Sequence, residues 1–213
     1  MNHRYWPLHG LRIRTPRLEL RLPDEALLDE LASVGAGGVH APDTMPFTVP
    51  WTVGEPDEVG RATYQHVLST IAGWRAQEWH LSLAVLHEGE VVGRQDVMGR
   101  EFGVRREVVT GSWLGLAHQG RGIGTEMRAA ALHLAFVGLG ARYAVCEARR
   151  DNGGSLGVSR RLGYEPDGLQ VQVIRGAATT LQRLRLDRAG WEKHRSVDVT
   201  VEGLDACRAD FGV

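Results

Sequence analysis

The feature that most constrains the fold is a glycine-rich turn between a strand-like run, residues 111–116, and an apolar helix-like run, residues 127–139. Glycines at such a turn expose backbone N–H groups, and the start of the helix adds partial positive charge. This combination suits phosphate, most naturally a pyrophosphate. The turn consists of Gln119, Gly120, Arg121, Gly122, Ile123, Gly124 and Thr125. We therefore expect an α/β chain that binds a phosphorylated ligand here.

Two other nucleotide-binding motifs are similar to this turn but do not match it. A P-loop needs Lys and then Ser or Thr after its last glycine, whereas Thr125 and Glu126 follow Gly124. A dinucleotide fingerprint would need Gly or Ala where Thr125 or Met127 stands. Glu147 could serve as its ribose-binding acid, but that fingerprint follows the first strand of its domain, and here most of the chain comes earlier. A dinucleotide-binding oxidoreductase and a purely structural turn stay open as alternatives.

The composition is that of an ordinary globular protein of 213 residues. Its net charge of −1 does not indicate nucleic-acid binding, and no apolar run approaches the roughly 20 residues that cross a membrane. Residues 1–17 are charged and lack an apolar core, so we expect no secretory signal. Cys146, Cys207 and the nine histidines show no metal-binding spacing. We expect a cytoplasmic protein with reduced thiols and no metal.

Periodicity and turn residues predict alternating strands and helices along the whole chain. Strands are expected at residues 18–22, 80–87, 91–98, 108–116 and 142–149, in two further runs between 164 and 186, and as an extra edge strand at 197–201. Helices are expected at residues 24–33, 56–74, 127–139, 155–162 and 187–194. This order indicates an α/β fold of the α+β sandwich type. We expect one domain over residues 1–213, with a core at about 11–193 and a C-terminal extension at about 194–213.

The long segment at residues 39–56 is rich in proline and aromatic residues, including Phe47 and Trp51. Such anchors argue against disorder. Two interpretations are equally supported: a hydrophobic patch that covers the edge of the core, or a wall of a substrate groove.

A second motif spans residues 152–164, about 30 residues after the glycine-rich turn. Asn152 and Ser155 stand at the start of a short predicted helix, and Gly163 ends it before Tyr164. Both polar residues are common helix caps. A serine hydroxyl in a first helical turn could also protonate, or hydrogen-bond, the leaving group of a ligand bound next to the helix start.

Together the two motifs resemble those of the GCN5-related N-acyltransferases (GNAT), and the similarity runs from about residue 11 to 193. The whole chain is most similar to the branch that acetylates ribosomal proteins at their amino termini. A narrower resemblance, to an actinobacterial group with a mycobacterial succinyl-CoA-dependent member, rests on segments 45–51, 111–116, 124–130, 158–161 and the tail. It implies a mixed, mostly antiparallel sheet of about seven strands with a central splay, flanked by four or five helices.

The resemblance implies a coenzyme A thioester, acetyl-CoA or succinyl-CoA, as co-substrate and an amine as acceptor: a protein N-terminus, a lysine or a small amine. It is compatible with a homo-oligomer. It also implies a bulge that splays the sheet at residues 111–116, with an N–H near Leu116 on the thioester carbonyl. The cofactor-binding residues would be Leu114, Gly115, Leu116, Gln119, Gly120, Arg121, Gly122, Ile123, Gly124, Thr125, Asn152 and Ser155.

The implied catalytic residues are Ser155 as general acid and Glu147 as the base that deprotonates the amine. Glu147 could instead be an exposed carboxylate paired with Arg149 or Arg150. A tyrosine that many relatives use is Ser159 here, and an acidic position of the ribosomal branch is Ile174. These departures keep a second hypothesis open, namely an acyl-CoA-binding regulatory module without turnover.

The acyl group would end beneath a lid formed by Phe47, Thr48 and Trp51, which are the expected substrate-binding residues. A succinyl tail needs a cation or several hydrogen-bond donors there. The sequence offers the Thr48 hydroxyl as a donor and His40, Arg94 or Arg100 as cations. We expect succinyl in preference to acetyl on the resemblance alone.

Overall fold

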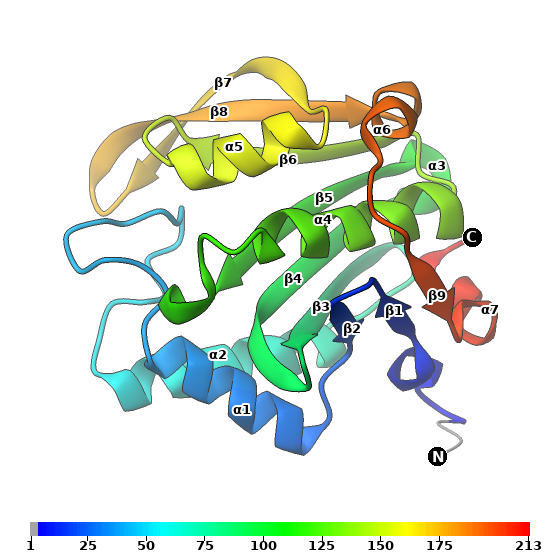
Figure 1. Ribbon diagram of the computed structural model, residues 1–213, viewed down its shortest axis with the longest axis horizontal. Helices are drawn as coiled ribbons and strands as arrows, with labels where there is room; N and C mark the ends of the chain where they lie inside the picture. The colour runs from blue at the N-terminus through cyan, green and yellow to red at the C-terminus, as the bar shows by residue number, and fades with distance from the viewer. Residues whose placement is uncertain (1–3) are drawn as a thin grey trace.

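The computed structural model describes residues 4–213; Met1–His3, the start of the segment expected to lack a secretory signal, lie outside the described residues. One twisted sheet runs through the molecule in the order β7-β8-β6-β5-β4-β3-β2-β1-β9 (Figure 1). All neighbouring strands are antiparallel except β5 and β6. The strands are β1 Arg12–Arg14, β2 Leu18–Arg21, β3 Glu78–His87, β4 Glu90–Arg100, β5 Glu107–Leu114, β6 Tyr143–Arg149, β7 Glu165–Ile174, β8 Ala177–Asp187 and β9 Thr200–Glu202.

The predicted α/β architecture is confirmed, with more elements than expected. Nine strands form instead of about seven, because the short strands β1 and β9 extend one edge. Seven α-helices occur in the described chain instead of four or five, two of them single turns: α1 Glu25–Ala36, α2 Pro56–Ala72, α3 Phe102–Arg105, α4 Ile123–His133, α5 Gly153–Arg161, α6 Arg188–His194 and α7 Leu204–Cys207. Among residues 4–213 no helix has the length and apolarity needed to span a membrane.

Local sequence explains how these elements begin and turn. The Asp24 side chain accepts a hydrogen bond from the Leu27 amide at the start of α1, as expected for an N-cap. At α2 a capping box joins Glu55 and Glu58. The predicted hairpin between β3 and β4 turns at Glu88 and Gly89, both with positive φ, which is the conformation of a tight two-residue turn.

Strand alternation divides the core between the two faces of the sheet. Leu81 and Leu83 of β3 belong to a large cluster that includes buried residues of α4, whereas Ala84 belongs to a second cluster with residues of α1 and α2. Helices α1 and α2 therefore cover one face and α4 the other (Figure 1). The segment after α6 also joins the larger cluster: Phe211 is fully buried with its ring 4.9 Å from that of Trp79.

The sheet opens between β5 and β6, the one parallel pair. Their pairing covers Glu107 to Val109 of β5 and ends opposite Val145, while β5 stays paired with β4 as far as Leu114. The expected bulge in β5 is wrong, since the β4–β5 register is continuous; register shifts occur instead between β3 and β4 and between β7 and β8. The predicted splay is nevertheless present, because β6 leaves β5 while keeping β8 as its partner.

Candidate active site

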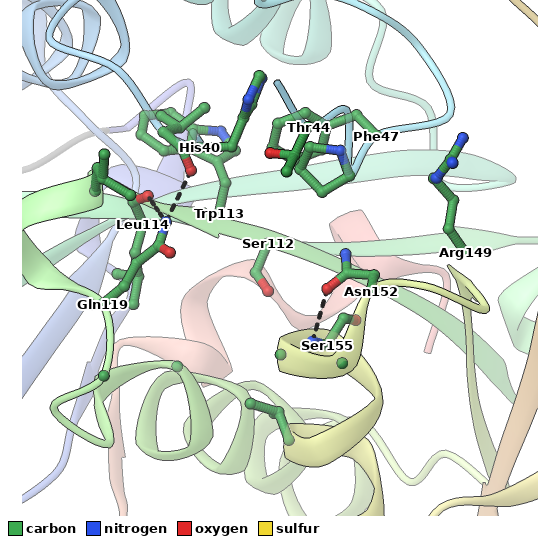
Figure 2. Close-up of a pocket in the computed structure, with 18 of the residues that line it drawn as sticks. His40, Thr44, Phe47, Ser112, Trp113, Leu114, Gln119, Arg149, Asn152 and Ser155 are labelled. Carbon is green, nitrogen blue, oxygen red and sulfur yellow. Dashed lines mark hydrogen bonds between the residues drawn. The ribbon is translucent and has the colours of Figure 1, made fainter. Parts of the chain in front are cut away.

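A cavity of about 900 Å³ lies at the open end of the splay (Figure 2). Five parts of the chain line it: the segment after α1, the end of β5, the glycine-rich turn with the start of α4, the β6–α5 connection, and α5. The lining includes His40, Thr44, Phe47, Ser112, Leu114, Leu116, Gln119, Gly120, Gly122, Gly124, Thr125, Arg128, Arg149, Asn152, Gly153, Ser155, Val158 and Arg161.

The glycine-rich turn presents the start of α4 to this cavity. Gly120 and Gly122 have φ of 74° and 79°, a left-handed conformation that side chains other than glycine rarely adopt. Gly122 is the N-cap of α4, and among residues 4–213 no side chain caps this helix start. The Thr125 and Glu126 amides donate to the Gly122 carbonyl at 3.1 and 3.2 Å, which leaves the amides before Thr125 for a ligand. Backbone donors with the positive end of a helix dipole therefore face the cavity, which is the arrangement that binds phosphate. Of the other predicted turn residues, the Ile123 side chain is buried in the core, and Arg121 does not line the cavity.

The start of α4 is fixed to the N-terminal part of the chain by Glu126. Its carboxylate accepts hydrogen bonds from the Thr15 hydroxyl at 2.6 Å and from Arg17 Nε at 2.7 Å. Arg17 also donates to the Arg121 carbonyl at 3.3 Å, which ties the turn itself. Burial would raise the pKa of Glu126, but the hydrogen bonds from Thr15 and Arg17 and the charge of Arg17 outweigh it, so the pKa is lowered.

Gln119 holds the turn against β5. Its side-chain amide donates to the Leu114 carbonyl at 3.0 Å and to the Val39 carbonyl at 2.8 Å (Figure 2). The side chain thus bridges the end of β5 and the segment after α1. Its amide donors are used within the protein, so Gln119 shapes the cavity through these bonds.

The open edge of β5 supplies main-chain groups. The Gly115 amide donates to Val92 at 3.0 Å and so points toward the β4 side. Because alternate residues of a strand point their N–H and C=O groups to opposite edges, those of Ser112 and Leu114 face the splay. The Leu116 amide itself is not available for the expected oxyanion role, since it donates to the Gly38 carbonyl at 3.0 Å. An oxyanion donor near Leu116 stays a prediction, and the Leu114 amide is the nearby donor that faces the splay.

At the β6–α5 connection, Asn152 caps α5. Its Oδ1 accepts from the Ser155 amide at 3.0 Å, so the capping interpretation of Asn152 is confirmed (Figure 2). Ser155 lines the cavity from the first turn of α5. The position is compatible with contact to a bound thioester, and the catalytic role of Ser155 stays a prediction.

Glu147 does not line the cavity, although Arg149 on the same side of β6 does. Its neighbour Cys146 faces α5, with Sγ 3.6 Å from the Ser159 hydroxyl, so Glu147 points to the opposite face of the sheet. There it is exposed and accepts a hydrogen bond from Gln172 at 3.0 Å. The expected pairing with Arg149 or Arg150 is not found: Arg149 binds Asp151 at 2.7 Å. The role of Glu147 as a base stays a prediction.

The aromatic segment after α1 forms one wall, as one of its two interpretations predicted. Phe47 lines the cavity together with His40 and Thr44 (Figure 2). Trp51 lies behind Phe47, with ring centroids 5.1 Å apart, and does not line the cavity; nor does Thr48. The core-cover interpretation holds too, because Phe47 and Trp51 pack against the cluster of α1 and α2. Of the three predicted substrate-binding residues, only Phe47 reaches the cavity wall.

The cations suggested for an acyl carboxylate are mostly elsewhere. Arg94 pairs with the buried Asp96 at 3.1 Å and does not line the cavity, and Arg100 is exposed outside it; only His40 is at the wall.

The prediction missed Ser112 and Arg128, which both line the cavity. A detectable signal for Arg128 was its place in a run of α4 that is otherwise apolar, residues 127–132. Residues 4–213 contain no group of three or more His, Cys, Asp or Glu side chains arranged to hold a metal.

Comparisons with known proteins agree with this geometry. Residues 17–165, more than half of the chain, match the acetyltransferase (GNAT) domain family. Mycobacterium smegmatis RimJ, solved in complex with CoA-disulfide, is 17% identical, with a TM-score of 0.70 and 95% of each chain covered. RimL, a ribosomal L7/L12 alpha-N-protein acetyltransferase solved with coenzyme A, is 21% identical, with a TM-score of 0.63 over 81% of this chain and 95% of its own.

A GCN5-related N-acetyltransferase from Brucella melitensis gives 19% identity and a TM-score of 0.68, over 86% of this chain and 81% of that one. At these identities the structures establish the shared fold, and the domain match establishes the relationship. The chain belongs to the GNAT acetyltransferase family.

Proposed function

We propose that this protein transfers a small acyl group from coenzyme A to a primary amine. The observation that carries the proposal is that the uncapped start of α4, the open edge of β5 and the first turn of α5 all border one cavity. The α4 donors suit a pyrophosphate, and the N–H and C=O of Ser112 with the N–H of Leu114 suit the amides of a pantetheine arm lying in the splay like an added strand. The Leu114 carbonyl is already bonded to Gln119. Residues 1–213 act as one domain in this proposal.

Glycines make room for such a ligand. A Cβ at Gly120 would meet no atom within 4 Å, and a Cβ at Gly124 would point between Leu114 and Val158, 3.8 Å from each. The space next to Gly124 therefore lies between β5 and α5, where the splay is open. Residues in this chain thus fit the phosphate and pantetheine parts of coenzyme A.

The proposed reaction is direct attack of the amine nitrogen on the thioester carbonyl carbon. The new C–N bond forms as the C–S bond breaks, the amine loses a proton to a base, and the CoA thiolate receives one. The Ser155 hydroxyl, at the cavity wall, is the proposed donor to the thiolate. Glu147 is the proposed base on the strength of the resemblance, and it would act from outside the cavity lining.

The acceptor we favour is a protein N-terminus. RimL, which shares this fold, is by name an alpha-N-protein acetyltransferase. Segment 39–47 borders the cavity beside the splay and would separate the thioester from solvent. For the acyl group, the sequence resemblance favours succinyl over acetyl.

A turnover assay tests the proposal. The protein would be mixed with acetyl-CoA or succinyl-CoA and a peptide with a free N-terminus, and release of the CoA thiol would be followed. Both peptides have the same sequence with one internal lysine, and in the matched control the N-terminus is blocked. We expect thiol release that depends on the free amine, with the mass of one acyl group added to the peptide.

Binding without turnover would favour the alternative, an acyl-CoA-binding regulatory module. In a single-turnover experiment with excess enzyme and a mixture of amines, such a module would bind acyl-CoA and release no thiol above the spontaneous rate. Absence of binding would contradict both.

A further inference from the structure

Arg128 is an unusual cation in this molecule. Three charged side chains are buried in the described part of the chain: Asp96, Glu126 and Arg128. Asp96 is paired with Arg94, and Glu126 with Arg17, at 3.1 and 2.6 Å. Arg128 is 5% exposed, and among residues 4–213 it makes no ion pair with a carboxylate.

The neighbours of the Arg128 guanidinium are neutral. One terminal nitrogen donates to the Ser112 hydroxyl at 2.8 Å, and the other donates to the Ser159 hydroxyl at 3.2 Å and lies 3.9 Å from the sulfur of Cys146. Its Nε is buried and has no hydrogen-bond partner in the described chain. A buried cation with neutral partners and a free donor is unfavourable unless an anion joins it.

The position of Arg128 indicates where that anion would come from. Arg128 lines the same cavity as Gly122, and both belong to the α4 region, so Arg128 lies roughly 9 Å farther along the helix at 1.5 Å per residue. Ser112 connects it to the open edge of β5, and Figure 2 shows the Ser112 side chain pointing from β5 toward the helices. Arg128 therefore lies beside the path of a pantetheine arm whose phosphates are at Gly122, and an arm that turns toward Ser112 ends near Arg128.

We propose that Arg128, with Ser112, forms a subsite for a carboxylate at the end of the acyl chain, so that the cavity takes a short dicarboxylic acyl-CoA. This inference rests on the proposed function. A guanidinium binds a carboxylate with several N–H donors at once, and in a water-poor site such a bond is strong. A monocarboxylic acyl chain of equal length would put apolar carbon against this buried charge.

Calorimetric titration of the wild-type protein tests the proposal with four ligands: CoA, acetyl-CoA, butyryl-CoA and succinyl-CoA. Butyryl and succinyl chains have four carbons each and differ in the terminal carboxylate. We expect succinyl-CoA to bind at least about tenfold more tightly than butyryl-CoA, or about 1.4 kcal/mol. A ratio of one or less overturns the proposal. A further titration adds free succinate to the complex with CoA. If CoA strengthens the binding of free succinate while succinyl-CoA binds no more tightly than butyryl-CoA, the site takes a free carboxylate and not the acyl tail, which also overturns the proposal.

Two variants locate the effect. Arg128→Gln should reduce the succinyl-to-butyryl ratio to about one, whereas Arg161→Gln, which removes an exposed cation from the cavity wall, should change both affinities by the same factor and keep the ratio. A ratio preserved in folded Arg128→Gln contradicts the assignment. If that variant does not fold, the wild-type ratio decides.

The outcomes also separate this inference from the proposed function. If CoA and acetyl-CoA bind but the ratio is one, Arg128 only joins β5 to α5, and the acyltransferase proposal stands. If none of the four ligands binds, the proposed function fails and the inference fails with it.

Discussion

The N-termini of α4 and α5 border the same cavity, yet only α5 begins with a side-chain cap. At α5 the Asn152 side chain accepts a hydrogen bond from the first turn at 3.0 Å. At α4 the N-cap is Gly122, and no side chain takes that place. A capped helix start has satisfied part of its donors, whereas an uncapped one keeps them for a ligand.

The comparison assigns different tasks to the two helices. Helix α4 offers its free donors to the phosphates, and its turn is held from behind by Arg17 and Glu126. Helix α5 uses its cap to fix the first turn, which keeps Ser155 at the cavity wall. The predictions below test this division, from the largest expected effect to the smallest.

The largest effect is expected at the first turn of α5. Ser155→Ala should lower kcat by roughly 100-fold, because the departing thiolate loses its proton donor, while KM for acyl-CoA changes much less. Steady-state kinetics measure both constants. Since the cap uses the Ser155 amide and not its hydroxyl, the melting temperature should stay close to wild type. A kcat equal to wild type would reduce Ser155 to a structural role.

The second-largest effect is expected at Glu126, which holds the turn before α4 in place. Glu126→Gln should lower the free energy of unfolding by about 1–2 kcal/mol at pH 7, because it replaces a carboxylate that accepts charged hydrogen bonds by an amide, and the half-exposed Arg17 limits the loss. Urea denaturation measures this. If the variant unfolds at the same urea concentration as wild type, the ion pair does not stabilise the fold.

The same residue predicts a pH dependence. The pKa of Glu126 is lowered in the folded state, so its stabilising contribution is complete above the unfolded value of about 4.3 and is lost as pH falls through the lower folded pKa. The stability difference between wild type and Glu126→Gln should therefore shrink below about pH 4. A difference that is constant from pH 7 to pH 3 would contradict the assignment.

The phosphate cradle, by which we mean the glycine-rich turn with the free amides at the start of α4, is tested at Gly124. A valine there fits the backbone, which has no positive φ, but would place methyl groups between β5 and α5. CoA affinity should fall at least about tenfold, or about 1.4 kcal/mol. Gly157→Val on α5 is the matched control, since a Cβ at Gly157 meets no atom within 4 Å and the residue does not line the cavity. Equal CoA affinity in the two folded variants would contradict the cradle.

The smallest effect is expected at the cap of α5. Asn152→Ala should lower the free energy of unfolding by about 1 kcal/mol, the usual loss of an N-cap, and change CoA affinity by less than the Gly124 variant does. Thermal denaturation and calorimetry measure the two quantities. A tenfold loss of affinity with unchanged stability would show that Asn152 acts mainly on the ligand.

Much of the fold followed from local sequence. The glycine-rich turn lies between β5 and α4 as predicted, and the hairpin at Glu88 and Gly89 and the caps at Asp24 and Asn152 are where short-range rules placed them. These features depend on neighbours within a few residues. The edge strand expected at residues 197–201 is present as β9, Thr200–Glu202. The three-residue strand β1 was not predicted, because it is defined by its pairing with β2 and β9 and not by a local pattern.

The site was less predictable where distant segments meet. The Leu116 amide is used by Gly38, far away in sequence, and strand alternation alone could not tell which side of β6 faces α5. Backbone angles could not be predicted from the sequence either. Gly122 has φ of 79°, so a valine there would strain the turn as well as block a ligand. Arg128 shows the same limit: within residues 4–213 it has no carboxylate partner, and this depends on three elements that pack around it.

The most direct test of the account is amide hydrogen exchange with and without CoA. Free donors at the start of α4 predict that CoA slows exchange most at residues 120–124, since the Thr125 amide already donates to the Gly122 carbonyl at 3.1 Å. Exchange should slow less at the first turn of α5, where the Ser155 amide is already bonded to Asn152. The Gly157→Val protein should show the same pattern and Gly124→Val a weaker one. Unchanged exchange at residues 120–124 under saturating CoA, or protection confined to another surface, would contradict the assignment of this turn as the phosphate site.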